Sequence, residues 1–335
     1  MNTIEKSLKS LEFDKIKEQL ANFAKTKQSK EICLNITPFD DIVKIKNELQ
    51  CTREAKQVLD IPNDIPIEFV ANIAQIQKNM GVSYLAEDEL IDIAKTLKTS
   101  RLVKKFLSDN LTMMSILRNA AQNLLTDKQL EDKIFGTFDE NLNIRPDATQ
   151  ELKNLYASLR DNEKNLKTTV NALLNSASFS KHLQENIYTT RDDRIVFQVM
   201  ASSKSKVPGI VHDVSATSKT FYIEPEQIVP LNNKIREIKA NIHSEMVKIL
   251  SGLTSLVKNE IKELALSEQI LATIDYHFAK ARYAVKLHAI EPEIVTHKFV
   301  EFENMKHPLL IGNVENVVTN NFEIGKDYKS VIITG

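Results

Sequence analysis

Glycine, proline and cysteine are scarce in this sequence, and tryptophan is missing from it. The 335 residues include only seven glycines and nine prolines. Because these two residue types interrupt regular structure, their scarcity favours long helices. The length predicts two or three domains, and the apolar share of 42% is enough for more than one hydrophobic core.

The small number of cysteines excludes several kinds of site. Cys33 and Cys51 stand far apart, outside any CxxC or Cys/His cluster, so we expect no zinc site and interpret both as reduced thiols of a cytoplasmic protein. The opening MNTIEKSLKSLEF is charged throughout, which argues against a signal peptide. No apolar run approaches the roughly 18 residues of a membrane helix, so no membrane partner is expected.

The balance of charge limits how this protein can meet a nucleic acid. Its formal net charge is −1, so any such partner must be bound by local basic patches. The acidic pairs Asp40-Asp41 and Asp192-Asp193 fit a helix start and a turn, and we expect no metal site there.

Hydrophobic spacing indicates helices in the first 130 residues. Leu11, Ile16, Leu20 and Phe23 lie three to five positions apart and predict one face of a single helix. Similar patterns continue to about residue 130. This part of the chain is therefore predicted to be an all-α block.

Two long helices and a small β unit are predicted next. After a tight β excursion at 137–144, apolar residues step by three and four over 147–176 and again over 228–265. Each narrow stripe needs a partner helix, so we expect the two to pair antiparallel. Between them the spacing changes to alternation, which predicts a β tip at about 185–224 with a hairpin across SATSK.

The segment after Pro292 is rich in strand patterns. The whole chain is thus predicted to be mainly α with a small β unit. We divide it into a helical core (1–146), an ascending helix (147–184), a β tip (185–227), a descending helix that returns to the core (228–291), and leading strands of an incomplete α/β domain (292–335).

One passage resembles a known family. Residues 207–238 are similar to the lever–clamp junction of the bacterial MutS paralogues of the second type; they read VPGIVHDVSATSKTFYIEPEQIVPLNNKIREI. SLEFDKIKEQLANFAKT, LATIDYHFAKARYA and KHPLL also resemble that family, in the right order along the chain. The matches in the junction are Pro208, Gly209, Val211, His212, Asp213, Ser215, Thr220, Glu224, Pro225, Asn232 and Asn233.

The resemblance gives a meaning to the final KSVIITG. In MutS-type ATPases such a strand leads into a glycine-rich phosphate-binding loop with an essential lysine. The resemblance implies that this chain is an N-terminal piece ending at the first glycine of that loop, Gly335. We therefore expect no ATP binding or hydrolysis by these residues alone, with ATP and Mg as cofactors of the complete protein. Val317, Val318, Asn320 and Gly335 match a partial nucleotide site.

The same resemblance implies a function and a rival. The complete protein would be a dimeric ATPase, in many relatives with a nuclease domain, that clamps branched or duplex DNA and suppresses homologous recombination. The alternative is a ribosome quality-control factor that binds ribosomal RNA and splits stalled or collided ribosomes. A plain coiled-coil scaffold is a third reading, which the alternation at 194–223 opposes.

Candidate contact residues follow from the β tip. Lysine and arginine in tip loops can bind phosphates without reading bases. The candidates are Lys204, Lys206, Lys219, Arg191 and Arg194. The alternative reading is an ordinary solvated surface, because three aspartates lie close in sequence.

Three weaker signals are kept as alternatives. A stripe of Lys95, Lys98, Arg101 and Lys105 fits a solvated helix face better than a nucleic-acid contact. FVE at 299–301 resembles a mismatch wedge, but we interpret it as part of a strand. His212 beside Asp213 predicts a structural hydrogen bond and no catalytic dyad, so no catalytic residue is assigned.

Overall fold

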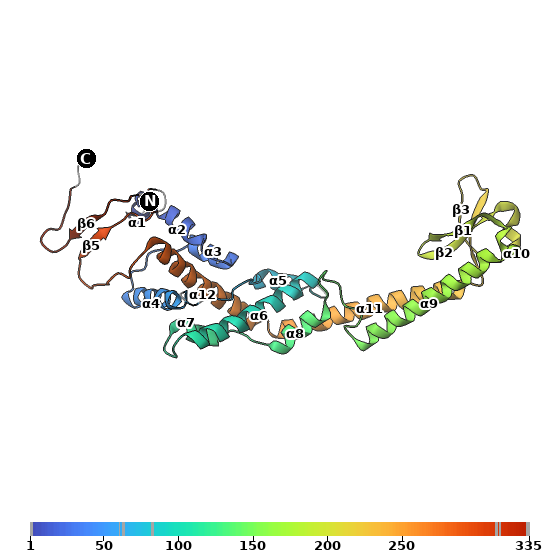
Figure 1. The fold of residues 1–335 in the computed structure, drawn as a ribbon, viewed down its shortest axis with the longest axis horizontal. Coiled ribbons are helices and arrows are strands. Elements are labelled where there is room, and N and C mark those ends of the chain that lie inside the picture. The colour runs from blue at the N-terminus through green and yellow to red at the C-terminus, as the bar shows by residue number, and fades with distance from the viewer. Residues whose placement is uncertain are drawn as a thin grey trace. The chain divides into compact units, whose positions relative to one another are not determined.

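The structure is a computed structural model that describes residues 3–59, 61, 64–81, 84–311, 314 and 316–332. The chain divides into two compact units (Figure 1). Unit 1 contains residues 1–82, 88–134 and 256–335, and unit 2 contains residues 83–87 and 135–255. The chain is mainly helical with two small antiparallel sheets, as the sequence predicts.

Unit 1 is built around helix α12, Ile261–Leu287, which packs against α2, α3, α4, α5 and α7. Apolar residues occur on most of its surface, and neighbouring helices bury them. The other helices are α1 (Thr3–Ser10), α2 (Phe13–Ala21), α3 (Lys27–Leu34), α4 (Ile42–Leu59), α5 (Ile73–Asn79), α6 (Glu87–Asn110), α7 (Ile116–Gln122) and α8 (Lys128–Thr137).

Two helix boundaries differ from the predicted ones. The helix expected over 228–265 ends at Asn259, and α12 begins after Glu260, whose φ of −101° and ψ of 7° leave the helical region. Near the start, Glu12 adopts a left-handed φ of 51°, so Leu11 lies outside α2 and is 65% exposed. Neither break contains glycine or proline, which is why hydrophobic spacing did not reveal them.

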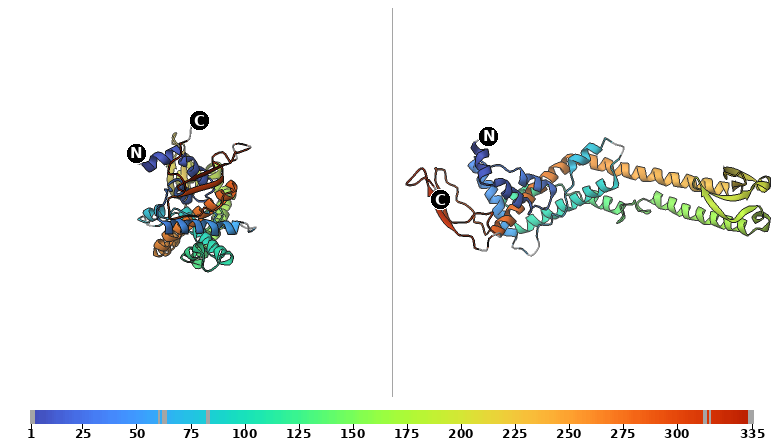
Figure 2. Two further views of the ribbon diagram at one scale, coloured as in Figure 1. Left: turned by 90° about the vertical axis from the view of Figure 1, so that its left-hand side faces the viewer. Right: turned by 90° about the horizontal axis from the view of Figure 1, so that it is seen from above.

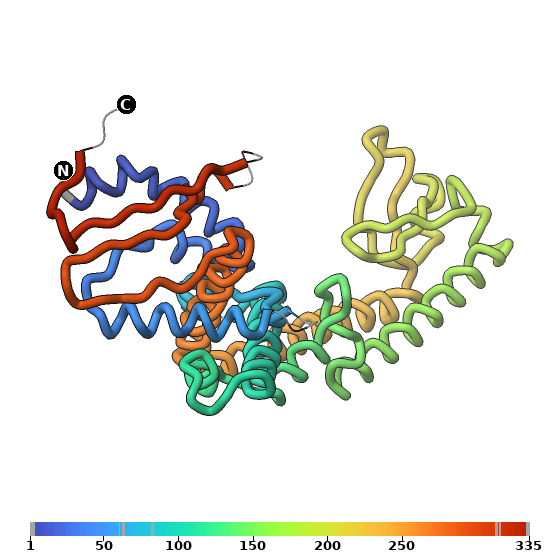
Figure 3. The backbone as a smooth tube through the Cα atoms, turned by 60° about the vertical axis from the view of Figure 1, so that its left-hand side comes forward, coloured from blue at the N-terminus to red at the C-terminus, as the bar shows by residue number. Residues whose placement is uncertain are grey.

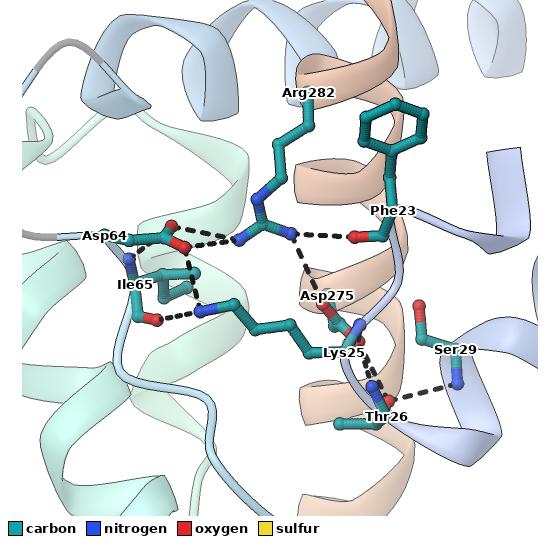
Figure 4. A network of polar contacts seen from close by, with 8 residues as sticks. All are labelled: Phe23, Lys25, Thr26, Ser29, Asp64, Ile65, Asp275 and Arg282. Atoms are coloured by element: carbon teal, nitrogen blue, oxygen red, sulfur yellow. Dashed lines mark hydrogen bonds and ion pairs between the residues drawn. The ribbon is translucent and has the colours of Figure 1, made fainter.

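A polar network anchors the segment before α3 to α12 (Figure 4). Asp275 is fully buried, and its Oδ2 accepts hydrogen bonds from the Lys25 and Thr26 amides at 2.9 and 2.8 Å. The Thr26 hydroxyl also donates to this oxygen and accepts from the Ser29 amide, which caps α3. One buried carboxylate therefore fixes both the start of α3 and its position on α12.

Arg282 extends this network to the edge of the unit. Its Nη2 donates to Asp64 Oδ1 at 2.9 Å, and Lys25 Nζ lies 2.8 Å from Asp64 Oδ2. Burial alone would raise the pKa of Asp64, but the hydrogen bonds from Lys25 and Arg282 outweigh it and hold that pKa below its usual range.

Unit 2 contains a pair of long helices and a four-stranded sheet. Helix α9, Gln150–Asn175, begins at the Thr149 cap, and α11, Val229–Asn259, runs antiparallel to it (Figure 2). Thr149 Oγ1 lies 3.2 Å from Glu245 Oε1, while Leu166 and Val170 share a buried cluster with Ile235 near the sheet. The predicted antiparallel pair is thus confirmed.

The sheet has the order β1-β2-β4-β3, and all neighbours are antiparallel. Its elements are α10 (Ala177–Ser180), β1 (Leu183–Arg191), β2 (Arg194–Met200), the 3₁₀ helix η1 (Ala201–Lys206), β3 (Gly209–Val214) and β4 (Thr220–Pro225). Asp192 and Asp193 both have positive φ, as a tight β1–β2 turn requires. Ser218 has a φ of 55° in the β3–β4 turn, a conformation that glycine adopts more readily.

A smaller hairpin follows unit 1's helices. Strands β5, Val300–Met305, and β6, Asn320–Ile324, pair antiparallel and appear red near the C-terminus in Figure 3. Phe299 is half-buried and stacks on His297, with 5.7 Å between ring centroids. The expectation that FVE at 299–301 is part of a strand thus holds for Val300 and Glu301, while Phe299 comes just before β5.

Candidate nucleic-acid interface

The predicted basic residues of the β unit fall into two groups. Lys204 and Lys206 lie on η1, and Lys219 precedes β4. The Ala201 amide donates to the Lys219 carbonyl at 3.0 Å, which brings the start of η1 beside Lys219. Arg191 and Arg194 flank the β1–β2 turn at the other end of β2, about 20 Å away for a seven-residue strand.

The lysine group carries uncompensated positive charge. Lys204, Lys206 and Lys219 are exposed, and no carboxylate of the described residues lies within 4.0 Å of their ammonium groups. The only ring contact among them places Lys204 Nζ 4.5 Å from the Phe221 ring centroid in the described part of the chain. Exposed ammonium groups of this kind suit phosphate oxygens.

Two residues that sequence reasoning missed lie beside this group. Lys181 is exposed, and His182 Nδ1 lies 3.1 Å from the Ser203 hydroxyl of η1. Desolvation, followed by the charges of Lys181 and Lys206, lowers the pKa of His182. These two residues follow α10 and are about 20 positions before η1 in the sequence. The fold brings them to η1, which is why the predicted loops did not include them.

Phe197, Phe221 and Tyr222 of the β unit offer little surface for base stacking, whereas Tyr188 of β1 is 43% exposed. Phe197 is fully buried and meets Phe179 edge-on at 5.1 Å. The cations of Lys204 and Arg191 cover Phe221 and Tyr222, with the Arg191 guanidinium carbon 4.3 Å from the Tyr222 centroid. These three rings are therefore buried or covered by a cation.

The two arginines have carboxylate partners within the chain. Arg191 Nε lies 3.4 Å from Asp213 Oδ2, and Arg194 Nη1 donates to both oxygens of the buried Glu224. Only 14% of the Arg194 side chain is exposed. Their contact with phosphate stays a prediction, and a nucleic acid would have to compete with these ion pairs.

Two of the four residues of the basic stripe of α6 form ion pairs within unit 1. Arg101 makes a two-pronged ion pair with Glu131 at 2.9 and 2.8 Å, and Lys95 lies 3.3 Å from Asp92. Lys98 and Lys105 remain exposed. This arrangement agrees with a solvated, partly ion-paired helix face.

The residues assigned to a partial nucleotide site lie around β6. Val317 is half-buried, Val318 is 79% exposed, and Asn320 begins β6. Gly335 lies outside the described residues. Among the described ranges, no group of three histidine, cysteine or acidic residues could hold a metal ion, and no described helix is long and apolar enough to cross a membrane.

Comparison with known proteins finds similarity along the whole chain, although no family model matches it. It is 35% identical over 334 residues to the protein named Endonuclease MutS2 of Clostridium novyi, and 34% identical to that of Clostridium beijerinckii. The Endonuclease MutS2 of Symbiobacterium thermophilum is 33% identical over 332 residues. These alignments cover 99% of this chain and 41–42% of each relative, so the chain spans about two-fifths of their length.

Proposed function

On the premise that this chain belongs to the MutS family, with MutS2 proteins as its homologues, we propose that its β unit binds nucleic acid through phosphates. The single observation that carries the proposal is the group of three exposed lysines, Lys204, Lys206 and Lys219, without carboxylate partners in the described residues. The burial of Phe197 and the cations over Phe221 and Tyr222 support contact with the backbone over stacking on these rings.

The physiological partner in this proposal is branched or duplex DNA, and the complete protein suppresses homologous recombination. The name Endonuclease MutS2 supports nuclease activity for the relatives. The complete protein here would bind ATP and Mg as a dimer. The antiparallel α9–α11 pair would carry the ATP-dependent state to the β unit. Ribosomal RNA presents the same phosphate chemistry, so stalled ribosomes remain the second candidate partner.

The test is to replace Lys204, Lys206 and Lys219 with alanine together. Affinity for duplex and branched DNA should fall. The slope of the logarithm of the binding constant against the logarithm of salt concentration should become shallower by about 0.9 for each lost phosphate contact. Binding is measured by fluorescence anisotropy across a salt series, with single-stranded DNA and ribosomes as further ligands.

A matched variant separates local contact from overall charge. Lys239, Lys258 and Lys262 are exposed on α11 and α12, and their replacement removes the same three charges. This control should keep the wild-type slope. If both triple variants behave alike, or if the first leaves the slope unchanged on every ligand, the lysine group is not the contact.

A further inference from the structure

A buried carboxylate joins the strands of the β unit. Glu224 of β4 is fully buried, and its Oε1 accepts hydrogen bonds from Arg194 Nη1 at 2.9 Å and Asn232 Nδ2 at 2.8 Å. Its Oε2 lies 3.1 Å from Arg194 Nη1 and 2.6 Å from His212 Nε2. Because a carboxylate only accepts, His212 carries a hydrogen on Nε2. Strands β2, β3 and β4 therefore meet at one side chain.

The same network reaches helix α11 through two neighbouring asparagines. Asn232 Nδ2 also donates to the Ile195 carbonyl at 3.2 Å, and its Oδ1 accepts from the Ile195 amide at 3.4 Å. Asn233 Oδ1 accepts from Arg194 Nη2 at 2.6 Å. Since both asparagines lie in the first turn of α11, the helix start is bonded to the first residues of β2.

Directional bonds of this kind fix an orientation in a way that apolar contacts do not. Ile228, Leu231 and Ile235 also pack α11 against the sheet, but such packing tolerates small rotations. A buried charge is costly unless every bond is made, so rotation of the sheet that broke these bonds would be opposed.

We propose that Glu224 and Asn232 are positioning residues that hold the β unit in one orientation on helix α11. They make the sheet and the helix move as one body, so a displacement of α11 is transmitted to the lysine group. The orientation itself stands on the contacts above, while its use in binding rests on the proposed function.

Distance measurement between two spin labels tests the orientation directly. The labels are placed at Thr217 in the β3–β4 turn and Lys239 on α11, both exposed. Cys33 and Cys51 should not react, because both are buried and burial raises the pKa of their thiols to about 11 and about 12. Double electron–electron resonance on the full chain then reports the distribution of distances.

The informative variant is Asn232→Ala, which removes the bonds of Asn232 to Glu224 and to the Ile195 backbone. The bonds of Arg194 and His212 to Glu224, and that of Arg194 to Asn233, stay in place. We expect the distance distribution of Asn232→Ala to broaden, and Glu224→Gln to do the same. Glu226→Gln is the matched control, because Glu226 is exposed and loses the same charge two residues away. A narrow, unshifted distribution in Asn232→Ala, whose sheet folds normally by circular dichroism, would overturn the proposal.

Nucleic-acid binding provides a second readout that a simple loss of contact would not mimic. Asn232→Ala should weaken duplex DNA binding by about tenfold, the size of one lost hydrogen bond to a charged group, at every salt concentration. Its salt slope should stay that of the wild type, because no phosphate contact is removed. A flatter slope would show that the network acts through charge and contradict a positioning role.

If the wild-type protein binds no nucleic acid, the proposed function is refuted, while the distance experiment still decides the orientation.

Discussion

At the scale of single residues, His277 shows how burial controls protonation in unit 1. The side chain is 4% exposed, and its Nδ1 has no hydrogen-bond partner in the described part of the chain. Burial, together with the nearby Lys280 charge, lowers the pKa of His277 to about 3. Glu48 lies 3.9 Å from Nδ1 but is paired with Lys280 at 2.7 Å, so it does little to favour the imidazolium.

This lowered pKa predicts a loss of stability in mild acid. The unfolded chain binds a proton at His277 below about pH 6.5 and the folded chain does not, so stability present above that pH falls as the pH decreases toward 3. From pH 8 to pH 5 the contribution to unfolding free energy should fall by about 2 kcal/mol. Urea unfolding of wild type and His277→Leu at both pH values measures the difference. His243→Leu, at an exposed site, should track the wild type, and parallel pH curves for His277→Leu would contradict the prediction.

At the scale of elements, the start of α9 depends on one hydroxyl. Thr149 Oγ1 accepts from the Leu152 amide at 3.1 Å and contacts Glu245 of α11. Thr149→Ala should therefore reduce the unfolding free energy by about 1 kcal/mol, the usual cost of a lost helix cap. Chemical denaturation gives the value. Thr168→Ala, on the exposed surface of the same helix, should have a clearly smaller effect, and equal losses would rule out the cap as the cause.

The long elements could be predicted from the sequence because periodicity extends over many residues. Leu166, Val170 and Ile235 follow the helical spacing, and the strands on either side of 215–219 follow the twofold spacing. The break at Glu260 carries no such signal, because the residues on both sides continue as helix.

The candidate site was less accessible to sequence reasoning, because its chemistry depends on tertiary contacts. The three lysines could be named from their loops, and the structure shows that their charges have no described carboxylate partner. Arg194 looked equivalent to them, yet Glu224 is 30 positions later and binds its guanidinium. His182 joins η1 only through the fold. Spacing along a chain cannot report which charged group faces another across a sheet.

At the scale of the whole molecule, the two units should respond separately to a change at Asp275. This carboxylate accepts three hydrogen bonds from Lys25 and Thr26 within unit 1. Removing a buried carboxylate whose Oδ2 holds three donors costs about 3 kcal/mol or more. We expect Asp275→Ala to accelerate amide exchange in α2, α3 and α12 and to leave β1–β4 unchanged, as measured by hydrogen–deuterium exchange mass spectrometry.

The control for this experiment lies in the same network. Asp64→Ala removes a carboxylate that is 46% exposed, so its effect on exchange in α3 and α12 should be much smaller. Faster exchange throughout β1–β4 in the Asp275 variant would show that the units unfold together.

Because unit 2 lies between two parts of unit 1 in the sequence, the ribosome completes unit 2 before unit 1. Helix α12, the centre of unit 1, is made only after residues 135–255 of unit 2. Translation adds about 5–20 residues per second, so α2–α5 and α7 wait roughly ten to fifty seconds for the helix that they pack against. Unit 2 interrupts unit 1 in sequence, and the nascent N-terminal helices are thus the stage at which aggregation or chaperone binding is most to be expected.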